Sequence, residues 1–123
     1  MLHFRHFVTF QTEGYPMKKT LNKAQTAFVN TLLQQMQVKP FNQISVSELS
    51  EAAEYDRRTF YRYFQTKEDI LYLYSAVLLE AMANDMKREA LTPRSGFLAY
   101  FKFWDTHRDF LTLLEKQGFL YFL

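Results

Sequence analysis

Hydrophobic residues recur at helical spacing near the start of the chain. Between Leu21 and Val38, the residues Ala24, Phe28 and Leu32 lie four positions apart, which puts them on one face of a helix. Polar residues fill most of the remaining positions, and a proline two residues after the stretch ends it. The pattern predicts a first amphipathic helix over residues 21–38.

A short second helix is predicted from its capping residues. Ser45 and Glu48 have the spacing of a capping box, in which the hydroxyl satisfies an early backbone N–H. The helix should run to about Ala53, with Leu49 and Ala53 facing inward.

Two more helices follow. Asp56 can cap a third helix over residues 57–64, and Thr66 can cap a fourth that reaches about residue 88. The segment 91–96, LTPRSG, contains a proline and a glycine and predicts a break, followed by helices over about 97–104 and 107–117. No alternating strand pattern occurs, so the predicted fold class is all-α.

The third helix has two unlike faces. Phe60 and Phe64 fall on one side, while Thr59 and Tyr63 lie on the flanks. The opposite arc consists of Arg57, Arg58, Tyr61 and Arg62. A charged outer face is most often only solvated, but a short capped helix and a tight turn before it favour a helix-turn-helix recognition element.

Composition limits the function classes. Hydrophobic residues make up 48% of the 123 residues and the net charge is only +2, so any affinity for nucleic acid must come from a local patch. The absence of cysteine excludes disulfides and thiolate sites. No apolar run reaches the roughly 20 residues that span a bilayer, and the first 16 residues do not resemble a signal peptide. We therefore expect a cytoplasmic protein without a membrane segment.

Catalytic and metal-binding patterns are weak. In DTHRD, Asp105 and Asp109 share one helical face while His107 lies on the other, so they do not converge. His3 and His6 could share a metal, but two ligands make a weak site. We predict no enzyme activity, no catalytic residue, no metal and no cofactor. An alternative is a helical interaction module or a membrane-surface module built on the aromatic C-terminal part.

The segment FNQISVSELSEAAEYDRRTFYRYFQTKEDIL, residues 41–71, resembles the N-terminal DNA-binding domain of the TetR family of bacterial transcriptional regulators. The resemblance implies a three-helix DNA-binding domain, a long connecting helix, and a helical ligand and dimerisation domain that is partial here. It divides the chain into an ill-defined extension (1–16), a helix-turn-helix domain (17–66) and a connecting and C-terminal part (67–123).

The resemblance also assigns roles to individual residues. Those matching positions that face the bases are Ser47, Arg57, Arg58 and Tyr61. Those matching positions that hold phosphates are Ser45, Thr59, Tyr63 and Lys67. The implied partners are a double-stranded DNA operator, an unknown small-molecule effector and a second copy of the chain, and the implied function is a repressor that the effector releases by moving the fourth helix.

The effector pocket that the resemblance implies would be lined by aromatic residues. The candidates are Tyr100, Phe103, Trp104 and Phe110. Plain helix packing explains any one of these residues equally well.

Two departures from the family pattern matter. Glu54 stands at a turn where the family often has glycine, so it must accept a left-handed backbone at a cost of about 1 kcal/mol. The chain also ends early, at GFLYFL, which we interpret as a truncated regulator, an isolated domain or a diverged short form, in that order. We therefore expect it to be monomeric, or to self-associate nonspecifically through FLYFL, and to bind DNA weakly with a steep salt dependence.

Overall fold

The structure is a computed structural model that describes residues 21–89 and 92–119. These residues form six α-helices and one 3₁₀ turn and no strand, which confirms the all-α class. The elements are α1 (Lys23–Met36), η1 (Phe41–Gln43), α2 (Val46–Ala53), α3 (Arg57–Tyr63), α4 (Lys67–Glu89), α5 (Pro93–Thr106) and α6 (Arg108–Gln117). The predicted extension, 1–16, lies outside the described residues.

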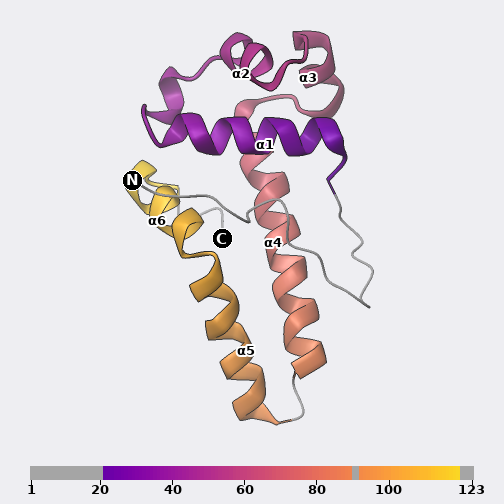
Figure 1. Ribbon diagram of the computed structural model, residues 1–123, viewed down its shortest axis with the longest axis vertical. Helices are drawn as coiled ribbons and strands as arrows, with labels where there is room; N and C mark the ends of the chain where they lie inside the picture. The colour runs from indigo at the N-terminus through magenta and orange to yellow at the C-terminus, as the bar shows by residue number, and fades with distance from the viewer. Residues whose placement is uncertain (1–20, 90–91, 120–123) are drawn as a thin grey trace.

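The helices are arranged along one long axis (Figure 1). α1 lies across the start of α4, with α2 and α3 at one end of the molecule. α4 and α5 pack against each other as a hairpin whose far end lies at the opposite end of the molecule. α6 returns the chain to the C-terminal end of α1.

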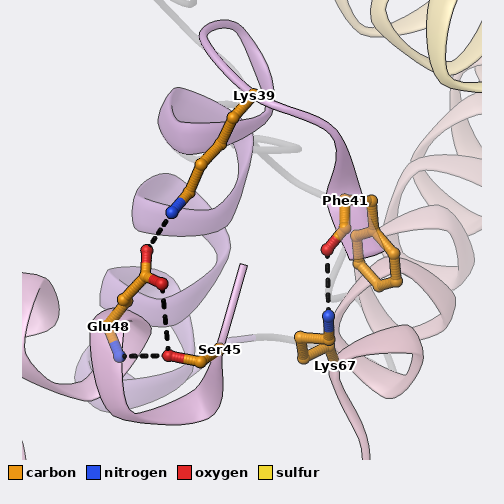
Figure 2. Close-up of polar contacts among 5 residues, drawn as sticks. All are labelled: Lys39, Phe41, Ser45, Glu48 and Lys67. Carbon is orange, nitrogen blue, oxygen red and sulfur yellow. Dashed lines mark hydrogen bonds and ion pairs between the residues drawn. The ribbon is translucent and has the colours of Figure 1, made fainter. Parts of the chain in front are cut away.

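The first three helices begin at side chains that accept backbone hydrogen bonds. The amide of Asn22 caps α1 in a full capping box with Gln25, at 2.8 and 3.0 Å. Ser45 caps α2 as predicted, accepting from the Glu48 N–H at 3.0 Å. The Glu48 carboxylate instead pairs with Lys39 (Figure 2), so it does not close the predicted box on the Ser45 backbone.

The start of α4 is stabilised from inside the helix. The Asp69 carboxylate accepts hydrogen bonds from the backbone N–H groups of Gln65 and Thr66, at 2.8 and 3.0 Å. The sequence predicts a capping role here for the Thr66 hydroxyl. Asp69 can serve this helix end because a carboxylate in the first turn both accepts these bonds and faces the positive end of the helix dipole.

The predicted break at 91–96 is wrong for residues 93–96, since α5 begins at Pro93. Proline at the first helical position lacks an N–H that would have no intrahelical partner there. Thr92 and Ser95 form a full capping box around it, with bonds of 3.0 and 3.1 Å. Gly96 is buried in α5, on the side opposite to exposed Leu98.

One hydrophobic core runs through the described residues. Phe28 of α1 is fully buried and contacts Phe60 and Phe64 edge to face, with ring centroids 5.5 and 6.0 Å apart. Farther along, Tyr74 of α4 contacts Phe110 of α6 at 4.8 Å. Because the same cluster includes residues from α1 to α6, packing is continuous across residue 66, and the domain boundary there stays a prediction.

Gln117 joins the end of α6 to the segment that follows α1. Its side-chain amide donates to the backbone carbonyls of Met36 and Lys39, at 2.9 and 3.2 Å. Its carbonyl accepts from the Phe41 N–H at 3.0 Å. Phe119 packs its ring on Phe41 at 5.0 Å, whereas the rest of FLYFL lies outside the described residues.

Glu54 has the left-handed backbone that its sequence position predicts, with φ 63° and ψ 38°. A side chain in this region costs about 1 kcal/mol, which glycine avoids. We expect Glu54→Gly to raise the free energy of unfolding by about 1 kcal/mol. Glu51→Gly, in the right-handed interior of α2, should lower it by about the same amount. Denaturant titrations would measure both, and a loss of stability in Glu54→Gly would contradict the strain.

The three hydrogen bonds of Gln117 predict a second effect on stability. Gln117→Ala removes all of them at a partly open site, so we expect the free energy of unfolding to fall by about 2 kcal/mol. Gln34→Ala, at an exposed glutamine near the end of α1, is the matched control and should change it by less than about 0.5 kcal/mol. Equal effects in the two variants would show that the Gln117 bonds contribute nothing specific.

Candidate nucleic-acid interface

α3 has the two faces that the sequence predicts. Phe60 is fully buried and Phe64, which ends the helix, is nearly so. The polar arc is exposed and consists of Arg57, Arg58, Tyr61 and Arg62. The buried rings therefore fix the helix while its cationic arc faces solvent.

The four residues predicted to face bases are all exposed and come from two helices. Ser47 lies on α2, and its hydroxyl accepts a hydrogen bond of 3.4 Å from the Arg57 guanidinium on α3. Tyr61 packs edge-on against Phe60, with centroids 5.0 Å apart, and is 56% exposed. Arg58 lies beside them on α3. The fold thus gathers guanidinium, hydroxyl and phenol groups on one surface.

Two of the predicted phosphate ligands have hydroxyl groups that already bond to carboxylates. The Thr59 hydroxyl lies 2.8 Å from the Asp56 carboxylate and donates to it. The Ser45 hydroxyl lies 3.4 Å from the Glu48 carboxylate, besides capping α2 (Figure 2). A hydroxyl has one proton to donate, so each would have to turn from its carboxylate to hold a phosphate.

Lys67, at the start of α4, makes two contacts with the 3₁₀ turn. Its ammonium donates to the Phe41 carbonyl at 2.9 Å (Figure 2) and lies 4.5 Å from the centroid of the Phe41 ring. An ammonium has three N–H groups, so donors remain for a phosphate. Tyr63 is 37% exposed at the end of α3. The phosphate roles of both residues stay predictions.

The cap of α3 is electrostatically coupled to its arginines. Asp56 accepts hydrogen bonds from the backbone N–H and the hydroxyl of Thr59, both at 2.8 Å. The bond from the Thr59 backbone, with smaller effects of the hydroxyl and of Arg58 and Arg62, holds the pKa of Asp56 below its usual value. The lowered pKa favours the ionised carboxylate. This carboxylate caps the N-terminus of α3, the helix that carries the arginines.

The four predicted effector residues differ in their burial. Phe103 and Phe110 are buried, whereas Tyr100 is 38% exposed and contacts Trp104 at 6.5 Å. An open groove of about 670 Å³ lies elsewhere, between the end of α1 and α6. Its lining includes Met36, Lys39, Leu113, Lys116 and Gln117. The pocket assignment stays a prediction.

Sequence reasoning missed the contacts that join distant segments to this surface. Gln117 bonds to Phe41 and Met36, and Lys67 bonds to Phe41, across 76, 81 and 26 positions. Helical periodicity carries no signal for such pairs. Among the described residues, no group of acidic or histidine side chains could hold a metal ion, and no helix is long and apolar enough to cross a membrane.

Comparison with known protein families gives a match in the first part of the chain. Residues 29–72 match the family model described as bacterial regulatory proteins, tetR family. The matched segment runs from the middle of α1 to the first turns of α4, so it includes the whole surface described above. No curated protein and no solved structure gives a significant match.

The Asp56 cap predicts an acid-sensitive component of stability. Because the folded-state pKa is lowered, the stabilisation is complete above the pKa of the unfolded chain and is lost as pH falls through the folded value. Asp56→Asn keeps a capping amide without the charge. We expect its free energy of unfolding to fall less than that of the wild type as the pH is lowered from neutral into the acid range. Parallel curves, followed by circular dichroism in urea, would contradict the assignment.

Proposed function

We propose that this chain, whose residues 29–72 are an N-terminal helix-turn-helix domain of the TetR family of bacterial regulatory proteins, is a sequence-specific repressor that a small molecule releases from DNA. The match supports a DNA-binding transcription regulator. Repression, release by an effector and the roles of single residues are the proposed part.

The observation that carries DNA reading is the exposed arc of α3. The guanidinium groups of Arg57 and Arg58 can each donate two parallel hydrogen bonds to a guanine edge or to a phosphate. The Tyr61 hydroxyl can bond to a base edge in the groove or to the DNA backbone. α3 has seven residues, so its position depends on Phe60 and Phe64 beneath it. A helix held this way can enter a major groove without first being ordered.

Phosphate contacts would come from the rim of the same surface. Thr59 and Tyr63 lie on α3 itself, Ser45 caps α2, and Lys67 begins α4. The dipole of α4 favours an anion at Lys67. Because two of the hydroxyls face carboxylates, we expect Lys67 and Tyr63 to contribute more than Ser45 and Thr59.

Release would require that the C-terminal helices influence the DNA-binding helices. Gln117 of α6 is bonded to the backbone of Met36, the last residue of α1, and of Lys39 and Phe41 between α1 and α2. These bonds would connect α6 directly to the proposed DNA-binding helices. Such a ligand would bind among the aromatic residues of α5 and α6. If it binds one arrangement of these helices more tightly than another, it shifts the population toward that arrangement and so changes the Gln117 contact. In this proposal the unit 17–66 binds DNA, the part 67–123 responds to the ligand, the protein works in the cytoplasm, and it needs no catalysis or cofactor.

Sequence-specific binding is tested by selecting, from a pool of random duplexes, those that the protein binds. Repeated selection from a random duplex pool should enrich a short motif for the wild-type chain. In titrations against that motif and a scrambled duplex, Arg58→Ala should weaken binding to the motif by about 1 to 3 kcal/mol and reduce discrimination. Lys67→Ala should weaken binding to both duplexes alike, because a phosphate contact carries no sequence information.

Two controls are needed to interpret the titrations of Arg58→Ala and Lys67→Ala. Lys87→Ala, at an exposed lysine about 30 Å along α4 from Lys67, should leave both affinities unchanged. Since Lys67 also bonds to Phe41, unfolding of each variant must be measured first. Selective loss of the preferred site in Lys67→Ala would show that the two roles are assigned wrongly, and failure to enrich any motif would overturn sequence-specific binding.

A further inference from the structure

Phe41, the first residue of the 3₁₀ turn, is bonded to both α6 and α4. Its backbone N–H donates to the side-chain carbonyl of Gln117 at 3.0 Å, which satisfies a group at the start of a turn that the turn itself leaves without a partner. Its carbonyl accepts from the Lys67 ammonium at 2.9 Å (Figure 2). This single buried residue therefore joins the end of α6 to the start of α4.

The ring of Phe41 is held at the same two helix ends. The Phe119 ring packs edge-on against it, with centroids 5.0 Å apart, and the Lys67 ammonium lies 4.5 Å from its centroid, where the ring attracts a cation. Phe119 follows α6 after a left-handed residue, Gly118 with φ 76°, and its N–H bonds back to the Leu114 carbonyl at 2.7 Å. The end of α6 thus contacts both the backbone and the ring of Phe41.

The position of the Lys67 ammonium depends on how Phe41 is held. The Phe41 carbonyl also accepts the Ile44 N–H at 3.1 Å, so the turn fixes its direction and leaves one lone pair for the ammonium. A lysine side chain has a flexible four-carbon stem, which contact with a carbonyl and a ring restricts. The carbonyl takes one of the three ammonium N–H groups, so donors remain for a phosphate.

We infer that Gln117 is a positioning residue for DNA binding: it fixes Phe41, whose carbonyl and ring hold the Lys67 ammonium ready for a phosphate. The inference rests on the proposed function. It goes beyond that function because it gives α6 a part in the affinity for DNA when no small molecule is present. A lysine that is ordered before binding loses less side-chain freedom when it meets a phosphate, so it binds more tightly.

A merely structural role for Gln117 makes a different prediction. Its amide also donates to the carbonyls of Met36 and Lys39, so its loss should lower the stability of the fold in either case. If the role is only structural, the folded variant should bind DNA as the wild type does. If Gln117 positions Lys67, the folded variant should bind DNA more weakly, and only while Lys67 is present.

The test is a double-mutant cycle on DNA affinity. The full-length wild type, Gln117→Ala, Lys67→Ala and the double variant are titrated with a scrambled duplex at several salt concentrations, at a temperature where all four are folded. Lys67→Ala should lower the slope of log affinity against log salt by about 1, as the loss of one phosphate contact does. Gln117→Ala should weaken binding about two- to tenfold, which corresponds to the ordering of one side chain. It should cause no further loss in the Lys67→Ala background.

Thr92→Ala is the control for lost stability. Thr92 caps α5, and α5 begins at the end of the molecule opposite to α2 and α3 (Figure 1). Loss of this cap should lower the free energy of unfolding as a lost helix cap does. The duplex affinity and the salt slope of Thr92→Ala should equal those of the wild type, because the contacts of Phe41 are intact.

The mobility of the Lys67 side chain gives a readout that needs no DNA. NMR relaxation of its terminal methylene and ammonium groups reports motion on the picosecond to nanosecond scale, and the signal is identified by its absence in Lys67→Ala. In the free protein we expect Lys67 to be more ordered than the exposed Lys102. Gln117→Ala should raise the mobility of Lys67 and leave that of Lys102 unchanged.

Two results would overturn the inference. One is a Gln117→Ala variant in which Lys67 stays as ordered as in the wild type. The other is a loss of DNA affinity in Gln117→Ala that is equally large with and without Lys67, since that effect would not pass through the lysine. A wild-type chain that binds no duplex would overturn the proposed function instead, and the mobility of Lys67 would still show whether Gln117 positions it.

Discussion

The edge-to-face contacts of Phe28 with Phe60 and Phe64 hold α3 and its exposed polar arc in place. α3 has seven residues, and isolated helices shorter than about 12 residues are marginal in water. Its stability therefore comes from the two rings that it buries against α1. The position of the exposed arginines depends on this contact, because α3 carries them. The proposed reading of base edges requires a helix whose position is fixed.

Features set by neighbouring residues could be predicted from the sequence. Caps at Ser45 and Asp56 depend on side chains three positions from the N–H that they bind, so spacing suffices to find them. The buried and exposed faces of α3 follow from helical periodicity. The left-handed backbone of Glu54 followed from its place at a turn between two capped helices, together with the family resemblance.

Features that depend on distant residues or on competing caps could not be predicted. The bonds of Gln117 to the backbone after α1 join residues 76 to 81 positions apart, and no local pattern marks them. The sequence predicts a break at Pro93, although proline also begins helices. The capping box of Thr92 and Ser95 decides between the two, but a threonine three positions before a serine is a weak sequence signal for a helix start. For the site, the residues predicted to face bases are exposed, while their contacts with DNA stay predictions.

The central claim is that the outward arc of α3 is the surface that meets DNA. Amide NMR signals of the labelled chain, followed while a selected duplex is added, test it most directly. The account predicts that the largest changes fall on residues 57–63 and Ser47, with smaller changes at Lys67 and little at residues 97–106. Changes concentrated on α5, with α3 unaffected in the folded protein, would contradict it.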